Sequence, residues 1–364
     1  MKQWQETGEI LERVAQLEAA GQGAALATVV RISGSAYRRP GAKFLIAEEG
    51  STLGGISGGC LEEDVRQNGL QIIGGGDCRL LHYETGEDDD ALWGLGLGCN
   101  GAVDIFVQPT RSEGFRENAG RVRTLLAGNA PFAAATLLDD RGGNGLAGRA
   151  VLAMPGAVQA GSSGDPQLDA ALMAAATASL AEQTSGIFET AGCRSFVETY
   201  LPPPVLALCG AGDDALPLAQ LAAEVGFRVA VIDHRPAYVN ASRFPAAWKL
   251  MQASPDDELE GLPTGENTYV VLKTHNLVRD KAWARRFLSW PVAYVGLLGP
   301  RARCEEIAAE AAEPDRSRIY GPVGVDLGAE GPEQVGLAVV AELLAVRAGR
   351  RPGHLKDRKA PIHD

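Results

Sequence analysis

Residues 205–215 read VLALCGAGDDA, and this stretch decides the fold of the second half of the chain. Its apolar start predicts a buried strand, and GAGDDA, from Gly210, matches the G-x-G-x-x-G/A turn that joins such a strand to a helix. Asp233 ends the next apolar run, 21 positions after Gly212, where dinucleotide-binding folds hold a ribose hydroxyl. The pattern predicts an α/β domain of Rossmann-like type, with a doubly wound parallel sheet, in which Gly210, Gly212 and Asp233 are candidates for binding a nucleotide.

Two acidic residues weigh against nucleotide binding at this turn. Asp213 and Asp214 fall in the first turn of the expected helix, where free N–H groups and the positive end of the helix dipole attract a pyrophosphate. Two carboxylates there satisfy the dipole and repel a second anion. Two interpretations therefore stay open: a domain that binds a nucleotide, and one that keeps the fold without classical NAD binding.

Further apolar runs alternate with helical patterns after this motif, which is typical of a parallel sheet with helices on both faces. The carboxyl ends of such strands meet at one edge, so the polar residues that follow them are expected to share a crevice. His275 follows one of these strands, and Arg301 and Arg303 open an expected helix after Pro300, a place that suits an anion. A structural histidine and solvated surface arginines explain the same residues equally well.

Pro202, Pro203 and Pro204 form the clearest break in the chain, because prolines are stiff and donate no ladder hydrogen bonds. We expect a mixed α/β domain over residues 1–200 with its core motifs at 24–110, a Rossmann-like domain over 203–350, and a polar tail over 351–364. Before the break, the patterns predict an N-terminal amphipathic helix, helices at 61–73 and 167–182, and strands at 24–33, 42–50, 78–85, 102–109, 132–140 and 148–154. No long internal repeat is evident.

The composition excludes several classes of function. The chain carries 34 basic and 46 acidic residues, a net charge of −12, which disfavours nucleic acid or an anionic membrane as a general partner. No apolar run approaches the ~20 residues of a membrane span, and the N-terminus lacks a signal-peptide pattern, so a cytoplasmic protein is expected. Six cysteines stand singly, which favours neither a zinc ribbon nor a disulfide framework.

Two cysteines follow glycines. Gly58 and Gly59 precede Cys60 in GGISGGCLEEDV, and Gly98 precedes Cys99 in GLGLGCNG. Bare backbone lets a bulky ligand reach the sulfur and lets several N–H groups point at it. Both cysteines are therefore candidate ligand-binding residues, with the alternative that they are small buried hydrophobes like the other four.

The charges around Cys60 act in opposite directions. The start of a helix favours a thiolate, whereas Glu62, Glu63 and Asp64 raise a thiol pKa. The basic loop that contains Arg38 and Arg39 restores the balance if it folds over the site.

SAYRRPGAKFLI, GGISGGCLEEDV and GLGLGCNGAVDIFVQP together resemble the N-terminal domain of the xanthine dehydrogenase accessory factor family, XdhC/CoxI. The strings at 206–238, 270–276, 293–303 and 321–347 resemble its C-terminal Rossmann domain. The resemblance implies an accessory protein, without turnover of its own, that carries molybdenum cofactor as cargo. Such a protein keeps the cofactor during sulfuration by a cysteine desulfurase and passes it to the apo-enzyme of a molybdenum hydroxylase, such as xanthine dehydrogenase or aerobic carbon monoxide dehydrogenase.

The resemblance maps onto individual residues. Cys60 stands at the SGGC cysteine, Cys99 at the GLGC cysteine, and Arg38, Arg39 and Gly41 in the basic loop. A thiolate suits the soft molybdenum–dithiolene centre, which makes Cys60 a candidate transient molybdenum ligand. The string Thr274-His275-Asn276 has asparagine where many members have aspartate, and Asp213-Asp214 replaces histidine-valine.

Other functions remain open at this stage. An NAD(P)-dependent oxidoreductase and a nucleotide-binding regulatory protein would both use the Rossmann-like domain. A homodimer would suit docking onto multimeric clients, although no residue pattern indicates one.

Overall fold

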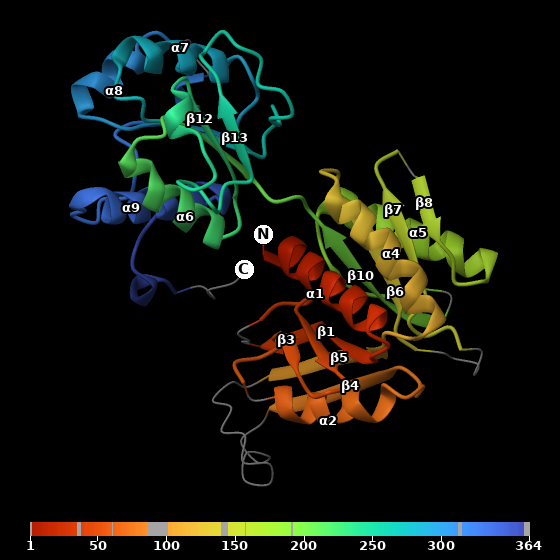
Figure 1. Ribbon diagram of the computed structural model, residues 1–364. Coiled ribbons are helices and arrows are strands. Elements are labelled where there is room, and N and C mark those ends of the chain that lie inside the picture. The colour runs from red at the N-terminus through yellow and green to blue at the C-terminus, as the bar shows by residue number, and fades with distance from the viewer. Residues whose placement is uncertain are drawn as a thin grey trace. The chain divides into compact units, whose positions relative to one another are not determined.

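The computed structural model describes residues 2–34, 38–59, 61–85, 101–139, 145–156, 158–190, 192–311 and 315–359. They form two compact units, divided after Pro202 (Figure 1). Each unit buries hydrophobic clusters of its own. Within these described ranges, no helix combines the length and apolarity needed to cross a membrane.

The second unit contains a six-stranded, all-parallel sheet in the order β13-β12-β11-β14-β15-β16. Its strands are β11 (Val205–Cys209), β12 (Arg228–Asp233), β13 (Lys249–Gln252), β14 (Thr268–Leu272), β15 (Tyr294–Leu297) and β16 (Ile319–Tyr320). The order reverses between β11 and β14, which is the arrangement of a doubly wound dinucleotide-binding fold. The predicted Rossmann-like fold is therefore confirmed, whereas β13 is an additional strand that the short sequence KLMQ did not reveal.

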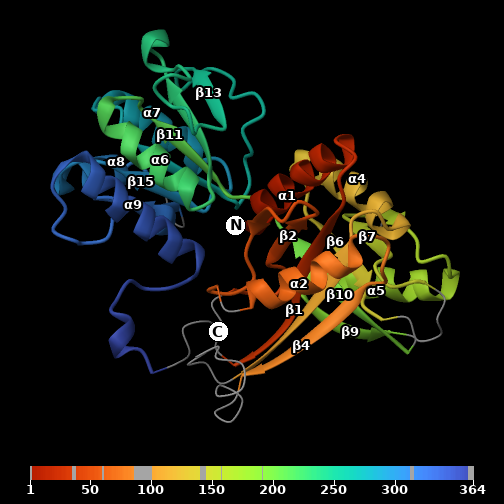
Figure 2. The same cartoon turned by 60° about the horizontal axis from the view of Figure 1, so that its bottom comes forward.

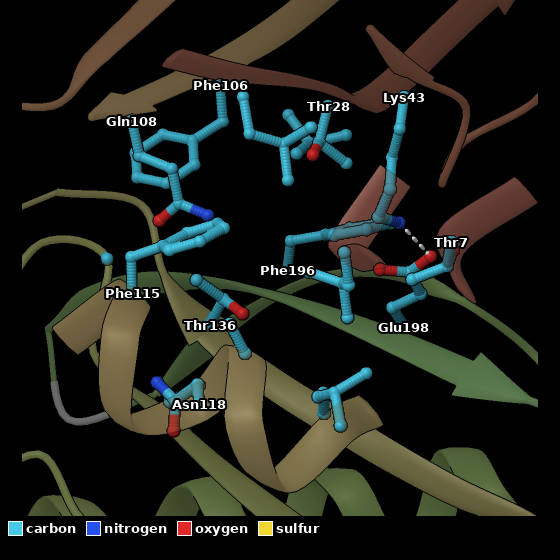
Figure 3. A pocket seen from close by; sticks show the side chains of 18 of the residues that line it. Thr7, Thr28, Lys43, Phe106, Gln108, Phe115, Asn118, Thr136, Phe196 and Glu198 are labelled. Carbon is cyan, nitrogen blue, oxygen red and sulfur yellow. Dashed lines mark hydrogen bonds and ion pairs between the residues drawn. The ribbon is translucent and has the colours of Figure 1, made fainter. Parts of the chain in front are cut away.

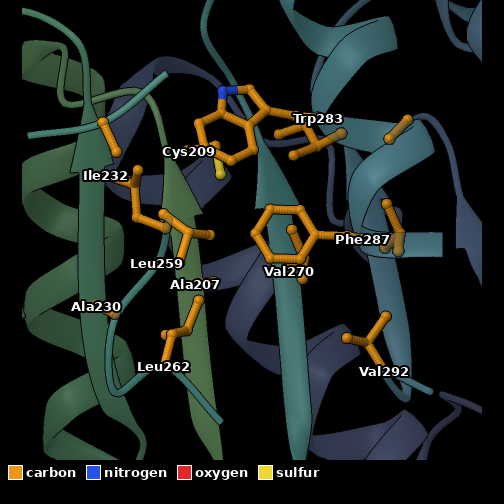
Figure 4. Close-up of a cluster of buried hydrophobic side chains, with 14 of the residues drawn as sticks. Ala207, Cys209, Ala230, Ile232, Leu259, Leu262, Val270, Trp283, Phe287 and Val292 are labelled. Atoms are coloured by element: carbon orange, nitrogen blue, oxygen red, sulfur yellow. The ribbon is translucent and has the colours of Figure 1, made fainter. Parts of the chain in front are cut away.

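Helices cover both faces of this sheet. The helices α6 (Leu216–Glu224) and α9 (Gly331–Arg347) pack on one face, and α7 (Leu277–Leu288) and α8 (Arg301–Ala308) pack on the other. Figure 4 shows the second of these clusters, where Trp283 and Phe287 of α7 lie over Cys209 and Val270. Cys209 and Cys304 are buried, as predicted, and burial raises the pKa of both thiols.

The first unit contains two five-stranded antiparallel sheets. The first has the order β3-β2-β1-β5-β4 and the second β8-β7-β6-β10-β9. Their strands are β1 (Ala24–Gly34), β2 (Lys43–Ala47), β3 (Thr52–Gly54), β4 (Arg79–Thr85), β5 (Gly101–Pro109), β6 (Phe132–Leu137), β7 (Ala150–Met154), β8 (Val158–Gly161), β9 (Gly186–Thr190) and β10 (Cys193–Tyr200). The strands predicted before the proline break are confirmed, and β3, β8, β9 and β10 are additional.

Helices complete this unit in layers (Figures 1 and 2). The helices α1 (Lys2–Ala19) and α4 (Glu113–Ala127) pack together between the sheets. The helix α2 (Glu62–Ile72) covers the outer face of the first sheet, and α5 (Pro166–Glu182) covers that of the second. Asp165 fixes the start of α5, since its side chain accepts hydrogen bonds from two N–H groups of the first turn.

The two halves of the first unit share one topology, helix–β–β–β–helix–β–β, which makes the expectation of no internal repeat wrong. Residues 5–30 align without a gap on 113–138, and Thr28 falls on Thr136. Ala27 pairs with Phe44 as Ala135 pairs with Val151, so the strand registers also match. The shift is 108 positions between β1 and β6, 107 between β2 and β7 and 90 between β5 and β10, so no single period links the two sequences.

Candidate functional site

The glycine-rich turn before α2 is the N-terminal candidate site. Cys60, Gly98 and Cys99 lie outside the described residues, whereas Gly58 and Gly59 lie in the exposed turn that leads to α2. The Glu62 carboxylate accepts hydrogen bonds from the N–H groups of Ser57, at 2.8 Å, and Ile56, at 3.1 Å. Burial alone raises the pKa of Glu62, but these hydrogen bonds and one from the Ser57 hydroxyl lower it by more. The net pKa is lowered, so the carboxylate stays ionised and holds the turn.

The basic loop reaches the same place. Arg38 and Ser57 both line a cavity of about 310 Å³, and Gly54 and Gly55 form part of its wall. Arg38 is paired with Glu6 of α1 at 2.7 Å, and Glu9 also lines the cavity. Arg39 lies exposed in the loop. The structure thus brings Arg38 and the glycine-rich turn together and adds two carboxylates that the sequence patterns did not single out.

The switch point of the second unit is the other candidate site. Gly210 has φ +114°, and a Cβ atom there would lie 2.4 Å from the Lys273 carbonyl oxygen, so only glycine fits between β11 and β14. A Cβ atom on Gly212 would lie 2.7 Å from Oδ1 of Asp214. In the dinucleotide motif the second glycine leaves its space to the pyrophosphate. In this chain the Asp214 carboxylate fills that space.

Two basic side chains hold Asp214 there. Its carboxylate lies 2.6 Å from Nζ of Lys273 and 2.9 Å from Nε2 of His275, a residue in the left-handed region at φ +56°. Lys273 is 3% exposed, and burial lowers the pKa of its ammonium although Asp214 opposes this. Asp213 pairs with Arg243 at 2.8 Å. Each aspartate thus has a basic partner, Arg243 or Lys273, that the sequence patterns did not identify.

Asp233 is occupied by its own chain. Its carboxylate accepts from the N–H groups of Ala211, at 2.8 Å, and Arg235, at 2.9 Å, and from the Arg235 guanidinium at 2.8 and 3.0 Å. Nδ1 of His234 lies 3.1 Å away. Burial raises the pKa of Asp233, but these hydrogen bonds outweigh it and the net pKa is lowered. The four hydrogen bonds from Ala211 and Arg235 fill the roughly four lone-pair positions of a carboxylate.

The remaining predicted residues are split by their contacts. Arg301 is exposed at the start of α8, whereas Arg303 is paired with the buried Asp280, which also accepts from the Thr274 hydroxyl at 2.6 Å. Asp214 and Lys273 line a cavity of about 240 Å³ whose other walls come mainly from α6 and α9. The residues at this crevice do not fit a dinucleotide in the usual mode, since the pyrophosphate space and the ribose-binding carboxylate are both filled.

A third cavity, of about 80 Å³, lies between the two sheets of the first unit, beside α1 and α4 (Figure 3). We call it the central cavity. Lys43 and Glu198, each 6% exposed, form an ion pair at 2.5 Å on its wall. The Tyr200 hydroxyl also bonds to Glu198, and burial raises the pKa of Tyr200 well above its usual value, so it stays neutral. In the part of the chain with described positions, no cluster of three or more metal-ligating side chains is found.

The sequence also matches known proteins. The family model "XdhC and CoxI family" matches residues 17–84, and "XdhC Rossmann domain" matches residues 206–343. A protein of Bacillus subtilis (strain 168) that is named as a probable xanthine dehydrogenase subunit is 34% identical over 329 residues, 89% of this chain and 93% of that protein. The chain belongs to the XdhC and CoxI family. The resemblance seen in the sequence motifs is confirmed.

Two further matches, to a named chaperone and to a crystal structure, extend the comparison. The "Molybdenum cofactor insertion chaperone PaoD" of Escherichia coli (strain K12) is 34% identical over 92 residues, 25% of this chain and 28% of that protein. A crystal structure described as a xanthine dehydrogenase from Bacillus halodurans has a TM-score of 0.76 at 28% identity, covering 94% of this chain and 96% of that one. The two-part α/β fold is thus shared along nearly the whole chain.

Proposed function

We propose that this XdhC and CoxI protein binds molybdenum cofactor as cargo and passes it to the apo-enzyme of a molybdenum hydroxylase. Family membership supports a role in maturation, and PaoD, similar over 92 residues, is named for cofactor insertion. The observation that carries the proposal in this chain is the cavity of about 310 Å³ where Arg38 and the turn that leads to Cys60 meet.

That cavity offers what a carrier needs. Its walls include the glycine backbone of Gly54 and Gly55, which leaves room for a flat ligand, and the Arg38 guanidinium, which suits a phosphate. Arg38 is paired with Glu6, so the phosphate of the cargo and the Glu6 carboxylate compete for the same guanidinium when the cargo binds and leaves. We propose Cys60 as the transient molybdenum ligand and Cys99 as a second thiol of the site. Sulfuration of the cargo by a cysteine desulfurase belongs to the same proposal.

Anaerobic titration with molybdenum cofactor tests it, with the full chain compared with Cys60→Ser, Cys99→Ser and Arg38→Gln. We expect near-stoichiometric binding by the wild type and weaker binding by Cys60→Ser and Arg38→Gln. Cys193→Ser is the matched control, because this cysteine lies in the second sheet. No binding by the wild type would refute the proposal. Unchanged binding by both cysteine variants would mean that the cargo does not contact the thiols.

The partners are tested by co-purification of the full chain with candidate molybdenum hydroxylase apo-enzymes and with a cysteine desulfurase. We expect the cofactor-loaded chain, but not the empty one, to activate its client apo-enzyme. The oligomeric state follows from light scattering of the same sample, where we expect a homodimer.

Nucleotide binding at the crevice is the competing role. Because Asp214 fills the pyrophosphate space and Asp233 is saturated, we expect no saturable change in NADH fluorescence on addition of the full chain. Saturable NADH binding would favour the oxidoreductase or regulatory alternative over a carrier.

A further inference from the structure

The internal repeat gives the central cavity two comparable sides. Gln108 of β5 corresponds to Glu198 of β10, since both stand two residues after the phenylalanine that pairs with Thr28 or Thr136. Ala150 of β7 corresponds to Lys43 of β2 through the matching registers of β2 and β7. One side of the cavity therefore carries a lysine–glutamate pair, and the other carries an alanine and a glutamine.

The side chains around these positions follow the same pattern. A Cβ atom on Gly41 would lie 3.1 Å from Oε1 of Glu198, and one on Gly148 would lie 3.0 Å from Oε1 of Gln108. Glu198 accepts from Lys43 and from Nε2 of Gln3 at 2.5 Å. The equivalent oxygen of Gln108 is buried and has no hydrogen-bond partner among the described residues. The side with Ala150 thus lacks both the donor and the four-carbon stem that fill the other side.

We propose that the central cavity binds a small neutral molecule with an apolar body and one hydrogen-bond donor, which bonds Gln108 and occupies the space that a lysine takes on the other side. A buried amide oxygen without a donor costs free energy, and such a molecule removes that cost. The lining offers aromatic contacts from Phe106, Phe115 and Phe196, and hydroxyl or amide groups from Thr136 and Asn118 (Figure 3).

Charge and volume limit the ligand. Gln108 and Ala150 are uncharged, and an ammonium buried beside them would lack the carboxylate that compensates Lys43. A volume of about 80 Å³ is roughly half of the ~150 Å³ of a cavity that holds benzene, and it corresponds to about two to three water molecules. A neutral alcohol or amide of about four non-hydrogen atoms, smaller than a benzene ring, is the class that fits.

The test uses the full chain and three probes of equal size: propan-2-ol, acetone, which lacks the O–H donor, and isopropylammonium, which carries a charge. Isothermal titration and ligand-observed NMR give the dissociation constants. We expect propan-2-ol to bind, acetone to bind about 2- to 10-fold more weakly, as loss of one neutral hydrogen bond requires, and isopropylammonium to bind more weakly still. No saturable binding of propan-2-ol, or tighter binding of isopropylammonium, would overturn the proposal.

Variants then locate the site. Gln108→Leu is expected to remove the preference for propan-2-ol over acetone, while Gln159→Leu, on exposed β8, is expected to keep it. Gln108→Glu combined with Ala150→Lys copies the ion pair of the other side and is expected to abolish binding of every probe. Thermal unfolding of each variant shows whether it is folded. If the double variant does not fold, the result for Gln108→Leu alone decides. A preference for propan-2-ol over acetone that survives in Gln108→Leu would overturn the proposal.

Discussion

Replacing Glu198 by glutamine tests how much the buried pair with Lys43 stabilises the first unit. The side chains of Lys43 and Glu198 are 7% and 9% exposed, so the ammonium left behind in Glu198→Gln stays out of water. Loss of one partner of such a pair costs about 3–5 kcal/mol, against about 0–1 kcal/mol for an exposed pair. At a factor of ten per 1.4 kcal/mol, the population of opened molecules rises about a hundredfold to a few thousandfold.

Hydrogen exchange of the full chain, followed by mass spectrometry on peptides from β2 and β10, measures that population where the pair lies. Glu49→Gln is the matched control, because Glu49 and Arg13 form a pair with side chains 37% and 39% exposed. The double variant Lys43→Ala with Glu198→Gln copies the residues of the other side, Ala150 and Gln108. It leaves no unpaired charge, so we expect it to exchange more slowly than Glu198→Gln alone.

Two results would refute this reasoning. An increase in exchange of less than tenfold in Glu198→Gln would mean that water reaches Lys43. The second such result is an increase in exchange in the double variant that equals the increases in Glu198→Gln and in Lys43→Ala multiplied together. It would mean that the two side chains act independently.

Two further predictions concern backbone and charge. Gly54→Ala and Gly161→Ala each place a Cβ atom 2.4 Å from a carbonyl oxygen of the neighbouring strand at φ +87° and +82°, whereas Gly156→Ala, at φ +81°, meets open space. We expect the first two to lower the thermal unfolding midpoint by similar amounts and by more than Gly156→Ala; equal effects in all three would contradict the clash, and unequal effects in the first two would contradict the match between the halves. The lowered pKa of Asp233 means that its contribution to stability is complete above the ordinary aspartate pKa, about 3.9, and is lost as pH falls below it. Urea unfolding at pH 6 and pH 3 should therefore show a smaller loss of stability on acidification in Asp233→Asn than in the wild type or in the exposed control Asp256→Asn. Equal losses in the three proteins would contradict the stabilising role of the Asp233 carboxylate.

The fold of the second unit was predictable because its signals are local. A continuous apolar strand, the turn from Gly210 and Asp233 at the next strand end are sufficient, and the observed sheet order agrees. The state of the crevice was not predictable, because the partners of Asp213 and Asp214 lie at Arg243, Lys273 and His275, 30 to 61 positions away.

The first unit shows the opposite balance. Its helices and longer strands follow from periodicity, but the repeat escaped because identity is concentrated in residues 5–30 and 113–138 and the later shifts differ. The Lys43–Glu198 pair has no local signal at all, since a lysine at a strand start and a glutamate within another strand are ordinary surface residues. Of the sites predicted at the cysteines, the structure describes the flanking Gly58, Gly59 and Arg38, and the role of the thiols stays a prediction.

The separation of Lys43 and Glu198 along the chain has a consequence during biosynthesis. The two residues are 155 positions apart, so a ribosome that adds about 5–20 residues per second makes Glu198 about 8–30 s after Lys43. Throughout that interval Lys43 has no carboxylate partner, so its ammonium stays in water. The strand β2 cannot complete its packing against the second half of the unit. The first half of the unit therefore completes its folding only after the second half has been translated.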